Sequence, residues 1–171
     1  MGASIKTGRT PLHIAAQNGY VQVAKFLVKQ GAELDMWDKY GWTPLSVGAL
    51  AGQEEEIQVL LDNVADVRVE KEVYDSALQA AAMAGHARIV QQLLNAGAPV
   101  KEPSDYGTTT LHFAALYGHV DVLDILLARS GGVHDQDRQG RTLLHIACAG
   151  GQVKAIQKFL GIGMRPQTQD L

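Results

Sequence analysis

Cysteine, surplus positive charge and long apolar runs are all scarce in this sequence. Cys148 is the single cysteine, which excludes an intrachain disulfide and a cysteine-based zinc site and favours a reducing intracellular location, the cytoplasm or nucleus. No apolar run approaches the roughly 18 residues of a membrane span, so membrane insertion is not expected. The 15 basic and 18 acidic residues leave no excess of positive charge with which to bind nucleic acid.

A period of 33 residues runs through the chain instead. Glycine recurs in step at Gly19, Gly52, Gly85, Gly118 and Gly151. Leucine recurs in step at Leu12, Leu45, Leu78, Leu111 and Leu144. Thr or Ser stands two residues before each of these leucines, at Thr10, Thr43, Ser76, Thr109 and Thr142. Copies that stay in phase without insertions predict a repeat architecture in which neighbouring units stack.

Each unit has the signals for two helices and a loop. Thr10 can cap a helix that begins with Pro11, and Gly19 ends that helix. A second helix with one apolar face follows from Val21 to Val28. The alternating stretch from Leu34 to Gly41 suits an extended, hairpin-like loop.

The opening motif of each unit resembles that of the ankyrin repeat family. It reads Thr10-Pro-Leu-His-Ile-Ala-Ala in the first unit and Thr109-Thr-Leu-His-Phe-Ala-Ala in the fourth. The resemblance implies an all-α solenoid of helix-turn-helix units joined by finger loops. We expect a single ankyrin repeat domain over residues 1-171, with repeats at about 8-40, 41-73, 74-106, 107-139 and 140-171. Residues 1-7 are then a partial leading finger or a cloning remnant.

The histidines and the cysteine are interpreted as structural. His13, His112 and His145 occupy one position of the repeat. Stacked helices lie about 8–10 Å apart, too far for these side chains to share one zinc ion, so each is expected to hydrogen-bond to a neighbouring finger. Cys148 falls in the alanine position of the first helix and is expected to be a small core residue. We therefore predict neither a metal nor a cofactor.

Partner recognition is expected at positions that the repeat leaves free. In the family these are the finger residues beside the turn glycine and the two residues before the helix-turn glycine, all facing a concave groove. Here they include Arg9, Gln17 and Ala51. The predicted protein-binding residues are Trp37, Lys39, Tyr40, Trp42, Leu50, Glu70, Glu72, Asp75, Met83, Asp105, Tyr106, Thr108, Leu116, Tyr117, Arg138 and Arg141.

Aromatic residues are concentrated at these free positions. Five of the chain's ten, including both tryptophans, stand there, and Trp and Tyr dominate binding hot spots. We therefore predict a groove centred on repeats 2 to 4 that docks a protein or peptide. The alternative is that the aromatics pack along the fingers and stiffen them.

The middle of the chain departs from the pattern. Val64 and Tyr74 stand where other repeats have glycine, so either the turns are rebuilt or strain is retained. Asn63 could close its helix one residue early, because asparagine tolerates the left-handed region. The junction of repeats 2 and 3 is thus expected to be the least regular and most mobile part. The acidic run from Glu54 to Glu56 is expected to be solvated at a helix start.

Together these observations predict a non-catalytic protein-protein interaction module, monomeric in isolation and a fragment of a larger scaffold or signalling protein. An engineered ankyrin binder is an alternative, although the varied framework, with Pro11 against Ala77 and Leu143, favours a natural sequence. An enzyme with a groove-located site is a further alternative. The free positions hold no histidine, which disfavours it.

Overall fold

The computed structural model describes residues 7–68, 76–100, 103 and 107–165. This part of the chain contains ten α-helices. Their bounds are α1 (Pro11–Asn18), α2 (Val21–Lys29), α3 (Pro44–Ala51), α4 (Glu54–Asp62), α5 (Ala77–Ala84), α6 (Ala87–Asn95), α7 (Thr110–Tyr117), α8 (Val120–Ser130), α9 (Leu143–Ala149) and α10 (Val153–Gly161). The described residues show no strand beyond an isolated bridge between Gln136 and Thr142, so the predicted all-α solenoid is confirmed.

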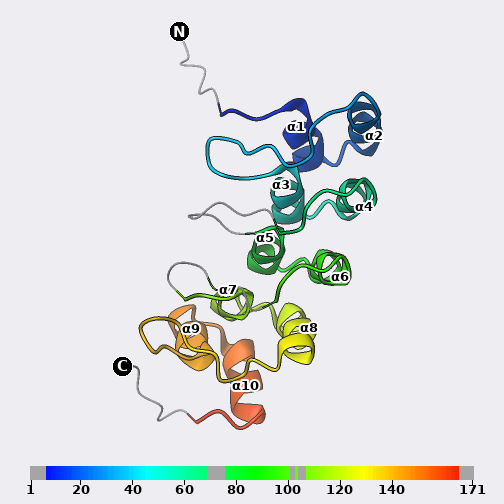
Figure 1. The fold of residues 1–171 in the computed structure, drawn as a ribbon. Helices are drawn as coiled ribbons and strands as arrows, with labels where there is room; N and C mark the ends of the chain where they lie inside the picture. Colours follow the sequence, from blue (N-terminus) through cyan, green and yellow to red (C-terminus); the bar gives the residue numbers. More distant parts are fainter. Residues whose placement is uncertain (1–6, 69–75, 101–102, 104–106, 166–171) are drawn as a thin grey trace.

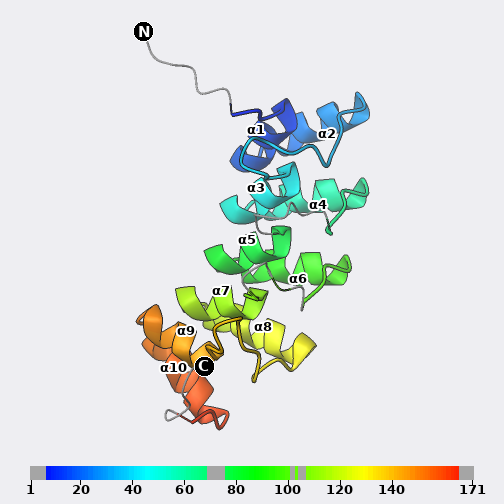
Figure 2. The same ribbon diagram turned by 60° about the vertical axis from the view of Figure 1, so that its left-hand side comes forward.

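The helices stack as five pairs, α1 with α2 through α9 with α10. Figure 1 shows the first helices of the pairs in one row and the second helices in a parallel row, with the finger loops projecting beside the first row. We call these the inner and outer rows. Seen from the side, the last pair, α9 and α10, is turned relative to the four before it (Figure 2).

Local sequence sets the ends of the inner helices. At the start of α1, the Thr10 hydroxyl accepts from the backbone N–H of His13, and the His13 ring accepts from the backbone N–H of Thr10 in return. Pro11 occupies the first turn, where no backbone donor is needed. At the other end, Gly19 adopts a left-handed conformation with φ 67°, which a residue with a side chain rarely adopts.

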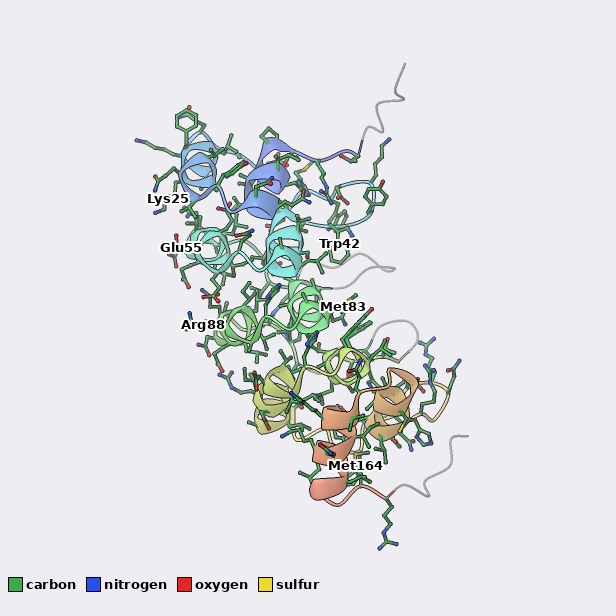
Figure 3. All side chains as sticks on the ribbon, turned by 180° about the vertical axis from the view of Figure 1, so that it is seen from behind. Lys25, Trp42, Glu55, Met83, Arg88 and Met164 are labelled. Atoms are coloured by element: carbon green, nitrogen blue, oxygen red, sulfur yellow. The ribbon has the colours of Figure 1, made fainter. Side chains whose placement is uncertain are left out.

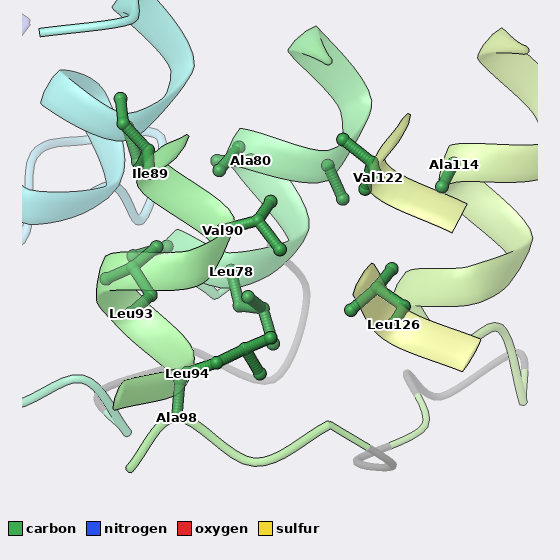
Figure 4. Close-up of a cluster of buried hydrophobic side chains, with 14 of the residues drawn as sticks. Leu78, Ala80, Ile89, Val90, Leu93, Leu94, Ala98, Ala114, Val122 and Leu126 are labelled. Carbon is green, nitrogen blue, oxygen red and sulfur yellow. The ribbon is translucent and has the colours of Figure 1, made fainter. Parts of the chain in front are cut away.

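A continuous apolar core runs between the rows. Figure 4 shows one section of it, in which Leu78 of α5 packs with Val90 and Leu94 of α6, near Val122 and Leu126 of α8. Alanine fills the inner-row positions where neighbouring pairs approach most closely, so the backbones can come together. The core is therefore elongated, and each section of it is formed by contacts between successive helix pairs.

Polar side chains at the start of the outer helices tie the second, third and fourth pairs to the pair before each. The Gln53 amide donates to the Gln17 carbonyl oxygen at 3.4 Å. The ring Nε2 atoms of His86 and His119 lie 3.3 Å and 2.9 Å from the carbonyl oxygens of Leu50 and Met83. These side chains pass directly beneath the helix-turn glycines. A Cβ on Gly52 would lie 2.6 Å from the His86 ring. This close approach is a second physical reason, besides positive φ, for glycine at this position of the repeat.

Glu56 contradicts the expected solvation of the acidic run. Glu54 and Glu55 are exposed, whereas Glu56 is fully buried, and neither of its carboxylate oxygens has a hydrogen-bond partner among the described residues. Helical periodicity is the reason, because Glu56 occupies the position held by Ile89 and Val122 in the next two outer helices. Burial raises the pKa of this carboxyl group above its ordinary value.

Val64 keeps the backbone conformation of the glycine it replaces. Its φ is 69°, and within the described residues it is the one non-glycine residue with positive φ. Asn63 has φ −100°, so the expectation that Asn63 enters the left-handed region and closes the helix early is wrong. The hydrogen bond from the Val64 N–H to the Leu61 carbonyl oxygen and the turn that follows hold the strained residue. Tyr74 and the rest of residues 69–75, in the junction of repeats 2 and 3 that was expected to be the least regular part, lie outside the described residues.

Replacing Val64 by glycine is expected to stabilise the protein by about 1 kcal/mol. Relief of left-handed strain is worth roughly 1–2 kcal/mol, and the added backbone entropy of glycine offsets part of it. The Val64 side chain is 86% exposed, so little packing is lost. Urea unfolding measures the change. Val153→Gly, at the exposed valine that begins α10, is the matched control and should give no gain, because the φ of Val153 is not positive and no strain is relieved; an equal gain in both variants would contradict strain at Val64.

Candidate functional site

The inner row and the fingers form one face of the solenoid. In Figure 3, Trp42 and Met83 lie on the finger side, and Lys25, Glu55 and Arg88 lie on the opposite side. Trp42 and Met83, two of the predicted binding residues, thus lie on a different surface from the charged side chains of the outer helices. Five predicted residues, Glu70, Glu72, Asp75, Asp105 and Tyr106, lie outside the described residues.

A pocket opens on this face between the first two helix pairs, with a volume of about 220 Å³. Its lining residues are Arg9, Gln17, Trp42, Val47, Leu50 and Ala51. Two of them, Trp42 and Leu50, are predicted binding residues, and three more stand at free positions of the repeat. Val47 was missed because its position in the inner helix belongs to the apolar framework, and no feature of the sequence separates it from the other framework residues.

Asp38 fixes the finger that carries Trp42. Its carboxylate is buried, and Oδ1 accepts hydrogen bonds from the backbone N–H groups of Tyr40 at 2.8 Å and Trp42 at 3.0 Å. The Asp38 N–H donates to the Trp42 carbonyl oxygen at 2.9 Å, and Gly41 closes the turn with φ 81°. Trp42 is half-buried and packs against the core, so one wall of the pocket is rigid.

Arg9 forms the opposite wall and is held just as firmly. Its Nε donates to Asp38 Oδ2 at 3.1 Å and its Nη1 to Gln17 Oε1 at 2.7 Å. Burial of the Asp38 carboxyl group raises its pKa, but the hydrogen bonds from Trp42, Arg9 and Tyr40 outweigh burial, and the net pKa is lowered. Asp38 is therefore ionised at neutral pH and its charge is compensated by Arg9 across two successive fingers.

Comparison with known proteins agrees with this architecture. A family model described as ankyrin repeats (3 copies) matches residues 1–71, 55–135 and 78–170. The chain belongs to the ankyrin repeat family. The comparison with curated proteins gave no match. Ankyrin repeats are generally protein-interaction modules and typically non-catalytic, and the three overlapping matches together span nearly the whole chain.

The ankyrin histidine at position 13 has the structural role expected of it. Its Nδ1 accepts from the Thr10 N–H at 3.1 Å, so Nε2 carries the proton and donates to the Trp42 carbonyl oxygen at 2.9 Å. Burial lowers the pKa of His13, which favours this neutral form. The same expectation is wrong for His112, because its Nδ1 bonds only to its own helix cap, Thr109, and its Nε2 atom is buried without a hydrogen-bond partner in the described part of the chain. No group of three His, Cys, Asp or Glu side chains there is arranged to hold a metal.

The other predicted groove residues do not gather in the pocket. Trp37, Tyr40 and Tyr117 are exposed at separate points along the fingers and inner row, and Tyr117 stacks on His119 with ring centroids 6.3 Å apart. Lys39 and Arg138 are exposed, and Met83, Thr108 and Leu116 are half-buried. They form an extended surface in place of a single cavity.

Arg141 repeats the finger chemistry of the second pair. Asp137 accepts from the backbone N–H groups of Gln139 and Arg141 and from Arg141 Nε at 2.7 Å. Burial raises the Asp137 pKa, but these hydrogen bonds outweigh it and lower the pKa overall. The Arg141 guanidinium is thus already engaged within its own finger.

Cys148 is not the core residue that was expected. It is exposed, whereas the alanines at the equivalent positions, Ala16, Ala49, Ala82 and Ala115, are fully buried. Those alanines are covered by the following helix pair, and Cys148 belongs to the last pair. No helix in the described part of the chain is long and apolar enough to cross a membrane.

Proposed function

We propose that this ankyrin chain is a non-catalytic interaction module that binds a protein segment along its concave face. The observation that carries the proposal is the pocket between the first two helix pairs, because residues at free positions of the repeat supply most of its lining. Framework residues are dictated by stacking. A pocket built from residues that stacking leaves free therefore fits a role in recognition.

The size and chemistry of the pocket fit one side chain of a partner. Pockets for drug-sized ligands and cofactors have volumes of about 300–1,000 Å³, larger than this pocket, whose volume is about 220 Å³. Trp42, Val47 and Leu50 give apolar walls, and Arg9 and Gln17 give a polar rim. An apolar side chain of an extended peptide would fill the space, with its backbone near the rim.

The lining residues favour binding over catalysis. None of the six is a nucleophile, a carboxylate or a histidine, and the nearest carboxylate, Asp38, is buried and engaged by Arg9. The exposed aromatics Trp37, Tyr40 and Tyr117 would extend the contact surface along the groove. The remaining proposed contacts are Lys39, Glu70, Glu72, Asp75, Met83, Asp105, Tyr106, Thr108, Leu116, Arg138 and Arg141. The single cysteine favours a cytoplasmic or nuclear setting for this binding.

A combinatorial peptide library displayed on phage tests the proposal. Selection against the wild-type chain is expected to enrich peptides with one shared apolar residue. Leu50→Arg, which places a charge in the pocket, should weaken the selected peptides at least tenfold, because an unpaired charge would be desolvated on binding. Fluorescence anisotropy of a labelled peptide gives the affinity.

Met36→Arg is the matched control. Met36 is an exposed apolar finger residue that does not line the pocket, so this variant should bind as the wild type does. Thermal unfolding of both variants checks that the fold is retained, which Leu50 allows since its side chain is 42% exposed. Peptides that bind Leu50→Arg and wild type equally would overturn the pocket as the recognition site.

A further inference from the structure

The polar side chains around the pocket between the first two helix pairs present hydrogen-bond donors. Arg9 donates through Nε to Asp38 Oδ2 at 3.1 Å and through Nη1 to Gln17 Oε1 at 2.7 Å. A guanidinium group has five N–H donors and no acceptor, so three donors remain beyond these two bonds. Trp42, on the facing wall, has an indole that can donate but cannot accept. The ligand atoms that match this rim are therefore acceptors.

Arg9 also fixes the orientation of the Gln17 amide. Since the guanidinium group can only donate, Gln17 turns its oxygen toward Arg9. The Gln17 Nε2 group is left beside Arg9 as a further donor, and the Gln17 side chain is exposed. Asp38, the carboxylate at this junction, is buried, and both its oxygens already accept hydrogen bonds. Arg9 thus engages the acceptors of its two neighbours and leaves donors facing a ligand.

Lys39 gives this rim a surplus of positive charge. Its backbone N–H donates to the Thr7 carbonyl oxygen at 2.9 Å, and a Cβ on Gly8 would lie 3.1 Å from Lys39 Cγ. The stem of Lys39 therefore lies against the backbone next to Arg9. The Lys39 side chain is exposed and forms no ion pair within the described residues. Because Arg9 and Asp38 compensate each other, the Lys39 ammonium group leaves this junction with a net positive charge.

We infer that the partner of the groove is an acidic protein segment, with a carboxylate side chain two residues from the apolar side chain that fills the pocket. An ionised carboxylate only accepts hydrogen bonds, and a guanidinium group can bind it through two parallel ones. Alternate side chains of an extended chain lie on the same side, about 7 Å apart, so an acid at this spacing faces the rim. The inference rests on the proposed function and adds the charge of the partner.

The groove favours an internal segment of the partner over a chain terminus. Met83, on the inner helix of the third pair, lies on the same side of the solenoid as Trp42 (Figure 3). An extended chain seated at the pocket can therefore continue along the inner row, and the carboxylate that meets Arg9 is a side chain of Asp or Glu.

The same phage selection tests this inference separately from the proposed function. Among the enriched peptides, Asp or Glu should outnumber Lys or Arg about fivefold or more at a position two residues from the shared apolar residue. The tightest of these peptides is then acetylated and amidated, so that its termini carry no charge. A copy with the acid replaced by Asn or Gln should bind about fivefold more weakly in fluorescence anisotropy.

Reversing the charge of Lys39 tests the electrostatic part. Lys39→Glu should weaken the acidic peptide about fivefold at about 0.05 M salt and leave the neutral copy nearly unchanged. Lys39 is exposed, so the substitution does not threaten the fold. Lys25→Glu is the matched control, because Lys25 is an exposed lysine of α2 on the opposite side of the solenoid (Figure 3). It changes the net charge of the protein equally and should bind as the wild type does.

Arg9→Gln tests the guanidinium group in a double-mutant cycle. In this variant the difference between the acidic peptide and its neutral copy should shrink from about fivefold to less than about twofold. The substitution leaves Asp38 without its cation, so thermal unfolding checks that the fold is retained. The comparison of Lys39→Glu with Lys25→Glu does not depend on that contact.

Enriched peptides that share an apolar residue but carry neutral or basic residues beside it overturn this inference and leave the proposed function standing. Equal affinity of the acidic peptide and its neutral copy, or equal weakening by Lys39→Glu and Lys25→Glu, overturns it as well. Peptides with no shared apolar residue, or peptides insensitive to Leu50→Arg, would instead overturn the pocket as the recognition site, and the inferred carboxylate contact with it.

Discussion

Replacing Glu56 by isoleucine is expected to raise the free energy of unfolding by about 2–4 kcal/mol. The carboxyl group of Glu56 is fully buried with both oxygens unpartnered in the described part of the chain. Isoleucine stands at the same position one repeat later, where Ile89 is also fully buried. The substitution removes a desolvated polar group and fills a site whose shape the fold already accommodates.

The pH dependence of this gain identifies its cause. Burial raises the pKa of Glu56 above its ordinary 4.5, so the folded protein retains a proton that the unfolded chain loses. That contribution to stability is complete below pH 4.5 and is lost as the pH rises through the folded pKa. The advantage of Glu56→Ile over the wild type should therefore be largest at neutral pH and shrink on acidification.

Urea unfolding at neutral pH and near pH 4 measures both effects. Glu55→Ile is the matched control, because Glu55 precedes Glu56 on α4 and is exposed, and it should leave the unfolding midpoint nearly unchanged. An equal gain from Glu55→Ile, or a gain from Glu56→Ile that does not depend on pH, would contradict burial of the Glu56 carboxyl group as the source of the instability.

Replacing Asp38 by alanine is expected to lower the free energy of unfolding by about 2–4 kcal/mol. The change leaves the N–H groups of Tyr40 and Trp42 without their acceptor and removes the partner of Arg9. The finger that carries Trp42 would loosen, so affinity for a groove peptide should fall as well. Asp38→Asn keeps an acceptor oxygen for the two amides and should lose less stability, mainly the ion pair.

Acid should act on Asp38 in the direction opposite to Glu56. The pKa of Asp38 is raised by burial but lowered more by its hydrogen bonds, and it lies below the ordinary 3.8. Its contribution to stability is present above pH 3.8 and is lost as the pH falls through the folded pKa. Urea unfolding from pH 6 down to about pH 2 should show the wild type losing stability in strong acid. An identical loss in Asp38→Ala would show that other groups cause it.

Much of the local structure could be predicted because its causes are local. The inner helices begin at the threonine and serine caps, where a hydroxyl acceptor is required, and the first four end at the period-33 glycines, where positive φ is required. The fifth, α9, ends one residue earlier, at Gly150. The same phase placed Trp42 and Leu50 among the binding candidates, and both line the pocket. The hydrogen bond from His13 to a neighbouring finger also followed from its repeat position.

The failures concern residues whose surroundings come from other helix pairs. Glu56 reads as part of a solvated acidic run, yet its helical phase turns it into the interface between the first two pairs. Cys148 shares the alanine position, yet no helix pair in the described part of the chain stacks over it and it is exposed. At Val64 the sequence left open whether the turn would be rebuilt, and the hydrogen bonds around it retain the left-handed backbone instead.

The sequence by itself determined the repeat, the order of helices and fingers, and the family, because caps, turn glycines and apolar periodicity act over a few residues. Only the tertiary structure decided which side chains the stack covers and which it leaves free. It buried the carboxyl group of Glu56, joined Arg9 to Asp38 across two fingers, and left Phe26 and Cys148 exposed at opposite ends. Whether a side chain is buried depends on the helix pair that stacks against it. The repeat period of the sequence gives the order of the pairs, but it does not show which side chains of one pair face the next.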